Sequence, residues 1–401
     1  MAEIKPEIET FAKIKVVGVG GGGGSAINRM VNSGIKGVEF VAVNTDIQAL
    51  HYNKASEKIH IGKTVTRGLG AGMNPELGKA AAEESENEIR EALKGCDMVF
   101  ITCGMGGGTG SGASPIVAKI SRELGALTVA VVTKPFAFEG GQRKNIADRA
   151  FSELADKVDT IITISNDKLL QVIDKKTSLL DAFNIADDVL RQGVQGIAEI
   201  ITVPGIINAD FADVKAVMSN AGSALMGIGQ ATGENKAIDA AKAAINSSLL
   251  DMSIDGARGI VFTITGGADL SMNEVSEAAK VITAAADDEA KIIFGAVIDE
   301  NLKDEIKITV VATGFDGKGS NTIKNEVVKN SYTQNSFIEE TERESVPSSS
   351  SWADKTKTKL SVFKNTPIKP IIEKKMEQPA TSNNSEEDDL SVPAFIRKKM
   401  L

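Results

Sequence analysis

The most informative part of this sequence is Gly104-Met105-Gly106-Gly107-Gly108-Thr109-Gly110-Ser111-Gly112. This glycine-rich run follows an apolar segment typical of a buried strand, and a helix-like segment follows it. Glycine leaves no Cβ to obstruct the turn, so consecutive backbone N–H groups can face one anion at the start of a helix. The run therefore predicts a phosphate-binding loop.

A second glycine-rich run, Gly18-Val19-Gly20-Gly21-Gly22-Gly23-Gly24-Ser25, also lies between a predicted strand and a predicted helix. Taken alone, it matches the dinucleotide-binding fingerprint, because Asp46 closes the next strand where such folds place a ribose-binding acid. An NAD site, as in an NAD-dependent oxidoreductase, therefore remains an alternative. It needs only one such loop, however, whereas two loops at neighbouring strand ends would converge on one polyphosphate. A P-loop is disfavoured because Glu57 occupies the position of its first glycine, ahead of Gly62-Lys63-Thr64.

Composition narrows the class of protein. The 401 residues have room for two domains and a tail, and the net charge of −9 argues against a general nucleic-acid binder. A nucleotide ligand is still possible, because helix N-termini hold phosphate without basic side chains. His51 and His60 are the only histidines, which argues against His-based metal sites and Ser–His catalysis. Cys96 and Cys103 lie in or beside apolar segments, which predicts reduced thiols and a cytoplasmic protein. The sequence predicts neither a signal peptide nor membrane insertion.

The order of apolar and helix-like segments predicts an α/β fold with a Rossmann-like parallel sheet. One long predicted helix joins it to a second α/β domain. Strands are predicted at residues 13–19, 38–43, 97–103, 127–133, 160–165, 259–265, 291–298 and 305–312. Helices are predicted at residues 75–94, 141–157, 179–201, 235–250 and 271–286.

A change of composition marks the tail. All 38 glycines lie at or before Gly319, whereas half of the ten prolines lie between Pro347 and Pro393. The predicted parts are a flexible N-terminus (1–12), a first domain (13–178), a central helix (179–203), a second domain (204–316), a disordered linker (317–385) and a C-terminal peptide (386–401).

The pattern Gly-Gly-Gly-Thr-Gly-Ser-Gly at residues 106–112 is typical of the tubulin and FtsZ family, and the chain resembles that family from about residue 13 to 315. The resemblance implies a tubulin/FtsZ-like fold whose first domain binds GTP and whose second domain activates GTP hydrolysis. It implies a GTPase that self-assembles head to tail into the division ring at midcell. A tubulin-like filament for DNA segregation is the alternative within the same family.

The resemblance also names the nucleotide-binding residues. They are Gly21, Gly22, Gly23, Gly24, Ser25, Asn44, Gly72, Gly107, Gly108, Thr109, Gly110, Glu139, Arg143 and Asn166. Neither glycine loop contains Lys or Arg, so backbone amides, helix ends and a bound Mg²⁺ are expected to meet the phosphate charge. No protein side chain is assigned to the metal.

Phe183 and Asp187 lie four residues apart on the predicted long helix, and hence on one face. An aromatic ring can stack on a base while a carboxylate accepts hydrogen bonds from its edge. An ionised carboxylate only accepts, so it favours guanine, which offers N1–H and an exocyclic amine, over adenine. The alternative is that Phe183 is a core residue and Asp187 is solvated.

Asn208, Asp210 and Asp213 follow the long helix with the spacing Asn-x-Asp-x-x-Asp. One interpretation makes Asp210 an N-cap and Asp213 a first-turn acid. By resemblance to the family, the two aspartates instead position or activate the attacking water, with Asn208 supporting them, on the nucleotide of the next subunit.

Apolar residues return at the end of the chain, between acidic and basic residues. One interpretation is a frayed tail. The other is a peptide that docks on membrane-tethering and regulatory division proteins, as the family resemblance implies. Its predicted contact residues are Val392, Pro393, Phe395, Ile396 and Arg397.

Overall fold

The computed structural model of the chain describes residues 12–172, 177–203, 205–247, 252–299, 302 and 304–315. All described residues belong to one compact unit, within Met1–Tyr332. The predicted linker, the C-terminal peptide with its five contact residues, and nearly all of the predicted flexible N-terminus lie outside the described residues.

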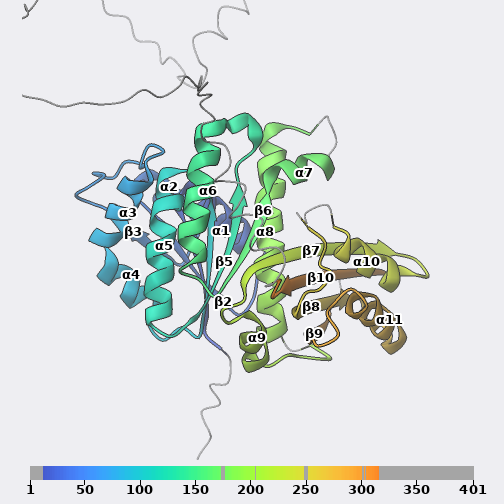
Figure 1. Cartoon of the computed structure of the whole chain (residues 1–401). Coiled ribbons are helices and arrows are strands. Elements are labelled where there is room, and N and C mark those ends of the chain that lie inside the picture. Colours follow the sequence, from blue (N-terminus) through green and yellow to red (C-terminus); the bar gives the residue numbers. More distant parts are fainter. Residues whose placement is uncertain are drawn as a thin grey trace, which may run out of the picture. The chain divides into compact units, whose positions relative to one another are not determined.

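The first half of the unit contains a six-stranded parallel sheet in the order β3-β2-β1-β4-β5-β6 (Figure 1). The strands are β1 (Ile14–Val19), β2 (Val38–Asn44), β3 (Glu57–His60), β4 (Met98–Gly104), β5 (Leu127–Lys134) and β6 (Thr160–Ser165). Successive side chains alternate between two buried clusters, as Val16 and Val17 do. Both faces of this sheet are therefore covered.

Helices form a layer on each face. One layer consists of α1 (Gly20–Asn32), α7 (Asn166–Val172), α8 (Leu179–Thr202) and α9 (Phe211–Met218). The other consists of α3 (Pro75–Glu84), α4 (Glu86–Leu93), α5 (Gly108–Glu123) and α6 (Gly141–Ala155). The short helix α2 (Ile47–Tyr52) follows β2, and a 3₁₀ turn, η1 (Ala137–Glu139), precedes α6.

The prediction of one helix over residues 75–94 is wrong, because the helix breaks at Ser85. Ser85 has φ −105° and ψ 20°, outside the helical region. Its Oγ accepts a hydrogen bond from the backbone N–H of Gly62, at 3.3 Å. A contact with a distant loop thus holds Ser85 at the break between α3 and α4.

The second half adds four strands to the same sheet, in the order β7-β10-β8-β9. They are β7 (Gly222–Thr232), β8 (Gly259–Gly266), β9 (Lys291–Ile298) and β10 (Glu305–Thr313). β10 is antiparallel to β7 and β8, whereas β9 is parallel to β8. β7 joins β6 in a parallel seam of three residue pairs, from Thr160–Gly222 to Ile162–Ala224. The predicted α/β class is confirmed.

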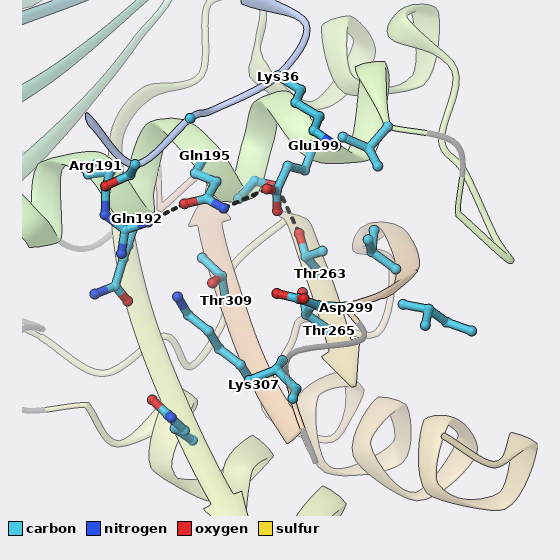
Figure 2. A pocket seen from close by; sticks show the side chains of 18 of the residues that line it. Lys36, Arg191, Gln192, Gln195, Glu199, Thr263, Thr265, Asp299, Lys307 and Thr309 are labelled. Carbon is cyan, nitrogen blue, oxygen red and sulfur yellow. Dashed lines mark hydrogen bonds between the residues drawn. The ribbon is translucent and has the colours of Figure 1, made fainter. Parts of the chain in front are cut away.

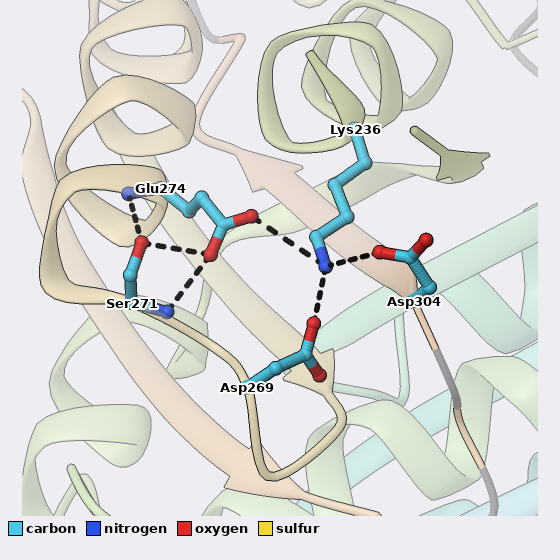
Figure 3. A network of polar contacts seen from close by, with 5 residues as sticks. All are labelled: Lys236, Asp269, Ser271, Glu274 and Asp304. Carbon is cyan, nitrogen blue, oxygen red and sulfur yellow. Dashed lines mark hydrogen bonds and ion pairs between the residues drawn. The ribbon is translucent and has the colours of Figure 1, made fainter. Parts of the chain in front are cut away.

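The helices α10 (Lys236–Ile245) and α11 (Met272–Thr283) pack on the second half, where one buried lysine joins several elements (Figure 3). The ammonium of Lys236 lies 2.6 Å from Asp269, 3.2 Å from Asp304 and 3.6 Å from Glu274. Its side chain is only 6% exposed. One cation therefore holds together the start of α10, the loop after β8, the first turn of α11 and the entry to β10.

The long helix α8 contacts both halves of the sheet (Figure 1), and two glycines let it lie close. A Cβ on Gly193 would stand 2.7 Å from Sδ of Met226, and one on Gly196 would stand 2.9 Å from Cγ2 of Thr309. Thr263 on β8 donates a hydrogen bond to the carbonyl of Gly196, at 2.8 Å.

None of the helices in the described ranges combines the length and hydrophobicity that crossing a bilayer would require.

Candidate functional site

The two glycine-rich runs meet at the carboxyl ends of β1 and β4 and enclose a cavity of about 360 Å³. They approach so closely that side chains would force them apart. A Cβ on Gly20 would lie 2.8 Å from the amide nitrogen of Gly110, and one on Gly22 would lie 3.1 Å from that of Gly104. The two predicted loops therefore form one site.

Two helices begin at this cavity, α1 at Gly20 and α5 at Gly108. The residues that precede them, Val19 and Gly107, make no side-chain capping hydrogen bond. The first amides of both helices are thus left without side-chain caps, and both positive dipole ends lie at the same place. Such an arrangement favours an anion with several oxygens, such as a polyphosphate.

Eleven residues predicted for nucleotide binding line this cavity together. They are Gly21, Gly22, Gly107, Gly108, Thr109, Gly110, Glu139, Arg143, Asn166, Phe183 and Asp187. Gly24, Ser25 and Asn44 line an adjoining cavity of about 310 Å³, which shares Gly21 with the first.

The two remaining predicted residues lie differently. Gly23 faces the sheet, since a Cβ there would lie 2.4 Å from the carbonyl oxygen of Thr102. It is needed for close packing below the loop. Gly72 is exposed with φ +55°, and its neighbour Ala71 lines the cavity instead. Ala71 belongs to the same short loop as Gly72, so this loop still borders the cavity.

Arg143 and Glu139 form an ion pair on one wall of the cavity. It is the only ion pair between two of the described residues that line the cavity. Glu139 also accepts a hydrogen bond from the backbone N–H of Phe136, at 2.9 Å. The side chain of Arg143 is 41% exposed, whereas that of Glu139 is 13% exposed. Glu139 is therefore fixed by the protein, and Arg143 retains donors for a ligand.

Helix α8 brings Phe183 and Asp187 to the cavity. Phe183 meets Phe136 edge to face, with ring centroids 5.4 Å apart, and remains 40% exposed. Burial raises the pKa of the Asp187 carboxyl to about 6, and the positive charge of Arg29 on α1 opposes this shift. Arg29, which the sequence prediction missed, lines a neighbouring cavity together with Phe183 and Asp187.

Asn166 is buried beside these two residues, and its Oδ1 has no hydrogen-bond partner within the described part of the chain. A buried acceptor without a partner costs free energy unless a ligand supplies a donor. Asn166 and Asp187 thus present acceptors to the cavity.

Asn208, Asp210 and Asp213 do not line this cavity. They follow the far end of α8, and the helix rise of about 1.5 Å per residue places Thr202 about 22 Å beyond Asp187. Asp210 is the N-cap of α9, its carboxylate accepting from the N–H of Ala212, and Asp213 lies in the first turn. The Oδ1 of Asn208 accepts from the N–H of Gly205, at 2.7 Å.

A larger cavity of about 760 Å³ separates α8 from the strands of the second half (Figure 2). The helix side carries a ladder of polar side chains in which Arg191 pairs with Asp188 at 2.7 Å and Gln195 donates to Glu199. Burial raises the pKa of Glu199 and lowers that of Lys307 on the opposite wall. The sequence prediction identified none of these residues.

Comparisons with known proteins agree with this geometry. Residues 13–174 match the GTPase domain of the Tubulin/FtsZ family, and residues 222–316 match the C-terminal domain of the FtsZ family. An FtsZ dimer from M. jannaschii is 48% identical, covering 77% of this chain and 90% of that one with a TM-score of 0.75. A point mutant of FtsZ from the same organism is 49% identical, covering 76% and 92% with a TM-score of 0.74.

A more distant structure shares the fold. CetZ2 from Haloferax volcanii, described as a GTPγS-bound protofilament, is 22% identical and covers 78% of this chain and 97% of that one, with a TM-score of 0.66. Two family matches and close similarity to FtsZ over most of the chain lead to one conclusion: this chain belongs to the Tubulin/FtsZ family and is a GTPase.

Proposed function

We propose that this GTPase assembles head to tail and completes each active site between two successive subunits. The observation that carries the proposal is the separation, along α8, of the phosphate-binding loops from the acidic segment at residues 208–213. A chain whose acids lie far from its own cavity can apply them only to the nucleotide of another copy. One structurally similar protein is described as an FtsZ dimer, which supports self-association.

The nucleotide would lie with its phosphates between the two glycine loops and its base against Phe183. Asp187 and the unpartnered Oδ1 of Asn166 would accept from the N–H groups of guanine, and Arg143 would donate to a phosphate. The NAD alternative is not supported, because two loops converge on one cavity and the family is a GTPase family.

Mg²⁺ fits this site only as a partner of the phosphates. Within the described ranges, no group of three or more His, Cys, Asp or Glu side chains is arranged to hold a metal. We therefore expect phosphate oxygens and water to supply most ligands of a bound Mg²⁺, which would neutralise part of the phosphate charge.

In the proposed reaction, Asp210 and Asp213 of one subunit position and activate the water that attacks the terminal phosphate bound by the next. Proton transfer to a positioned carboxylate is typically worth about 10²–10⁴-fold in rate. We further propose that the filament forms the division ring at midcell, and that the C-terminal peptide links it to membrane-tethering and regulatory proteins.

The first test measures specific GTPase activity against protein concentration, for the full chain and for Asp213→Ala. A shared site predicts almost no activity at high dilution, a threshold, and then a rise to a plateau. Asp213→Ala should bind GTP and assemble, but hydrolyse it at least about 100-fold more slowly.

The matched control is Asp239→Ala, which removes a first-turn acid from α10 in the same half of the molecule. It should keep the threshold and the plateau, because only the favourable interaction with the helix dipole is lost. Full specific activity at high dilution would contradict the shared site, and so would an Asp213→Ala variant with normal turnover.

A further inference from the structure

A buried hydroxyl pair connects the second glycine loop to the strand β2. Thr45 follows β2 and is completely buried, and its Oγ1 lies 2.9 Å from Oγ1 of Thr109. Thr109 occupies the first turn of α5, is 7% exposed, and lines the cavity. Thr45 does not line the cavity, so its hydroxyl reaches a ligand there through Thr109.

The position of Thr45 is fixed by its neighbours. Its carbonyl oxygen lies 3.1 Å from Nε2 of His60 on β3, and the next residue, Asp46, caps α2. The carbonyl of Asn44 accepts from the N–H of Ile61, at 3.0 Å. The hydroxyl of Thr45 is therefore held at the end of a rigid parallel pair of strands.

The direction of the hydroxyl pair depends on what occupies the cavity. A threonine hydroxyl has one hydrogen to donate, and a phosphate oxygen can only accept. If a phosphate lies beside Thr109, the hydrogen of Thr109 goes to the phosphate, and Thr45 must then donate to Thr109. Hydrogen bonds arranged in such a chain strengthen one another in a buried site.

The surroundings of Thr109 indicate which phosphate is concerned. A Cβ on Gly20 in the first loop would lie 3.4 Å from Cβ of Thr109. A Cβ on the preceding residue, Gly108, would lie 2.8 Å from Cβ of Ala71. If the base lies against Phe183, as proposed above, the phosphate chain extends along the loops to the place where Gly108 meets Ala71, next to Thr109.

We propose that Thr45 is a positioning residue for the terminal phosphate of GTP: its buried hydroxyl donates to Thr109, which in turn donates to that phosphate. The inference rests on the proposed nucleotide site and adds a residue that lies outside it. It makes Thr45 a determinant of the preference for GTP over GDP, because GDP lacks the phosphate that orients the pair.

The test compares Thr45→Val, which keeps the shape and loses the hydroxyl, with Thr45→Ser, which keeps the hydroxyl. Dissociation constants for GTP and GDP are measured on the full chain below its assembly threshold. Thr45→Val should raise the dissociation constant for GTP by about 2- to 12-fold, the range expected for the loss of one net hydrogen bond. The dissociation constant for GDP should stay nearly unchanged. Thr45→Ser should stay close to the parent protein.

The matched control is Thr128→Val. Thr128 forms an equally buried hydroxyl pair with Ser121, at 2.7 Å, on β5 and α5 but outside the cavity. Its loss should lower the melting temperature without changing the ratio of GTP to GDP affinity. Equal weakening of both nucleotides by Thr45→Val would overturn the proposal, because a structural defect acts on both.

A double-mutant cycle with Thr109→Val distinguishes failure of the proposed role of Thr45 from failure of the proposed phosphate site. If Thr45 acts through Thr109, the double variant should bind GTP as weakly as Thr109→Val alone, whereas additive effects would overturn the proposal. If Thr109→Val leaves GTP binding unchanged, the proposed phosphate site itself is wrong. If Thr109→Val weakens GTP but Thr45→Val does not, only the role of Thr45 fails.

Discussion

The carboxyl group of Asp187 lies where its charge is disfavoured unless a ligand provides donors. Burial raises its pKa to about 6, so part of the nucleotide-free protein carries a protonated Asp187 in mildly acidic solution. A protonated carboxyl has lost acceptor capacity and gained a donor, which opposes the N–H groups of guanine. Guanine binding should therefore favour the ionised form and release a proton below pH 6.

This linkage predicts how GTP affinity depends on pH. Well above pH 6 the affinity should be constant, and below it the affinity should fall by up to about tenfold for each pH unit. Titration calorimetry in buffers of different ionisation enthalpy measures both the affinity and the proton release.

Asp187→Asn provides the control, because asparagine does not titrate. It should lower the affinity for GTP by about 10-fold or more, because hydrogen bonds to charged groups are worth about 1.5–3 kcal/mol. It should also make the affinity for GTP independent of pH in this range. A pH profile that persists in Asp187→Asn would assign the titration to another group.

At the scale of secondary-structure elements, the lysine cluster around Lys236 makes a prediction about stability. The hydrogen bond with Asp269, the hydrogen bond with Asp304 and the charge of Glu274 raise the pKa of Lys236, while Lys236 lowers the pKa of Asp269. Lys236→Met keeps the length of the buried side chain but leaves three carboxylates without their shared cation. We expect the melting temperature to fall by a few degrees, as measured by calorimetry.

The sign of the pH dependence follows from these shifts. The stabilisation from Asp269 is present above the ordinary pKa of an aspartate and is lost as the pH falls through its lowered value. The difference between Lys236→Met and the parent protein should therefore be widest near neutral pH and narrow in acid. Lys242→Met, an exposed lysine of the same helix, should change the melting temperature little.

The sequence predicted the long apolar and periodic elements, but not those whose sequence reflects contacts with distant parts of the chain. Five of the six parallel strands of the first half, all except the four-residue β3, and helix α8 were predictable because long apolar or periodic segments report burial directly. β7 was missed because it contains glycines that read as loop. A Cβ on Gly227 or Gly229 would stand 1.9 Å from a carbonyl oxygen of α10. The glycines are therefore required by the close packing of α10, which the sequence pattern of the strand does not reveal. The break at Ser85 likewise depends on a distant loop.

The candidate site shows the same division. Gly21 and Gly23 belong to the same run of glycines, so the sequence does not distinguish them. The turn of α1 places them on opposite sides, where Gly21 lines the cavity and Gly23 packs on Thr102. Thr45 carries no motif at all. Its relation to Thr109 appears only once β2 and α5 are packed together.

At the scale of the whole molecule, a site shared between subunits predicts recovery of activity on mixing. Asp213→Ala subunits should bind GTP but lack an acid, and subunits with Asn166→Ala and Asp187→Ala should keep the acids but bind GTP poorly. In an equal mixture, up to about a quarter of the head-to-tail joints combine an intact nucleotide site with intact acids. GTPase activity should then exceed the sum of the two separate proteins.

The control mixture combines Asp213→Ala with Asp210→Ala, in which every joint lacks one acid. It should show no recovery. Recovery in this control, or none in the first mixture despite normal co-assembly by light scattering, would argue for a site contained within one chain.

The short seam between β6 and β7 has a mechanical consequence. Load along a sheet is shared among the hydrogen bonds of each ladder, and here the ladder is three residue pairs long, whereas β7 and β10 pair over eight. Under tension, the molecule should yield first between its halves, which would open the core cluster that spans them and leave intact the cluster confined to each half. Helix α8, packed against both, would then be the last link to carry the force.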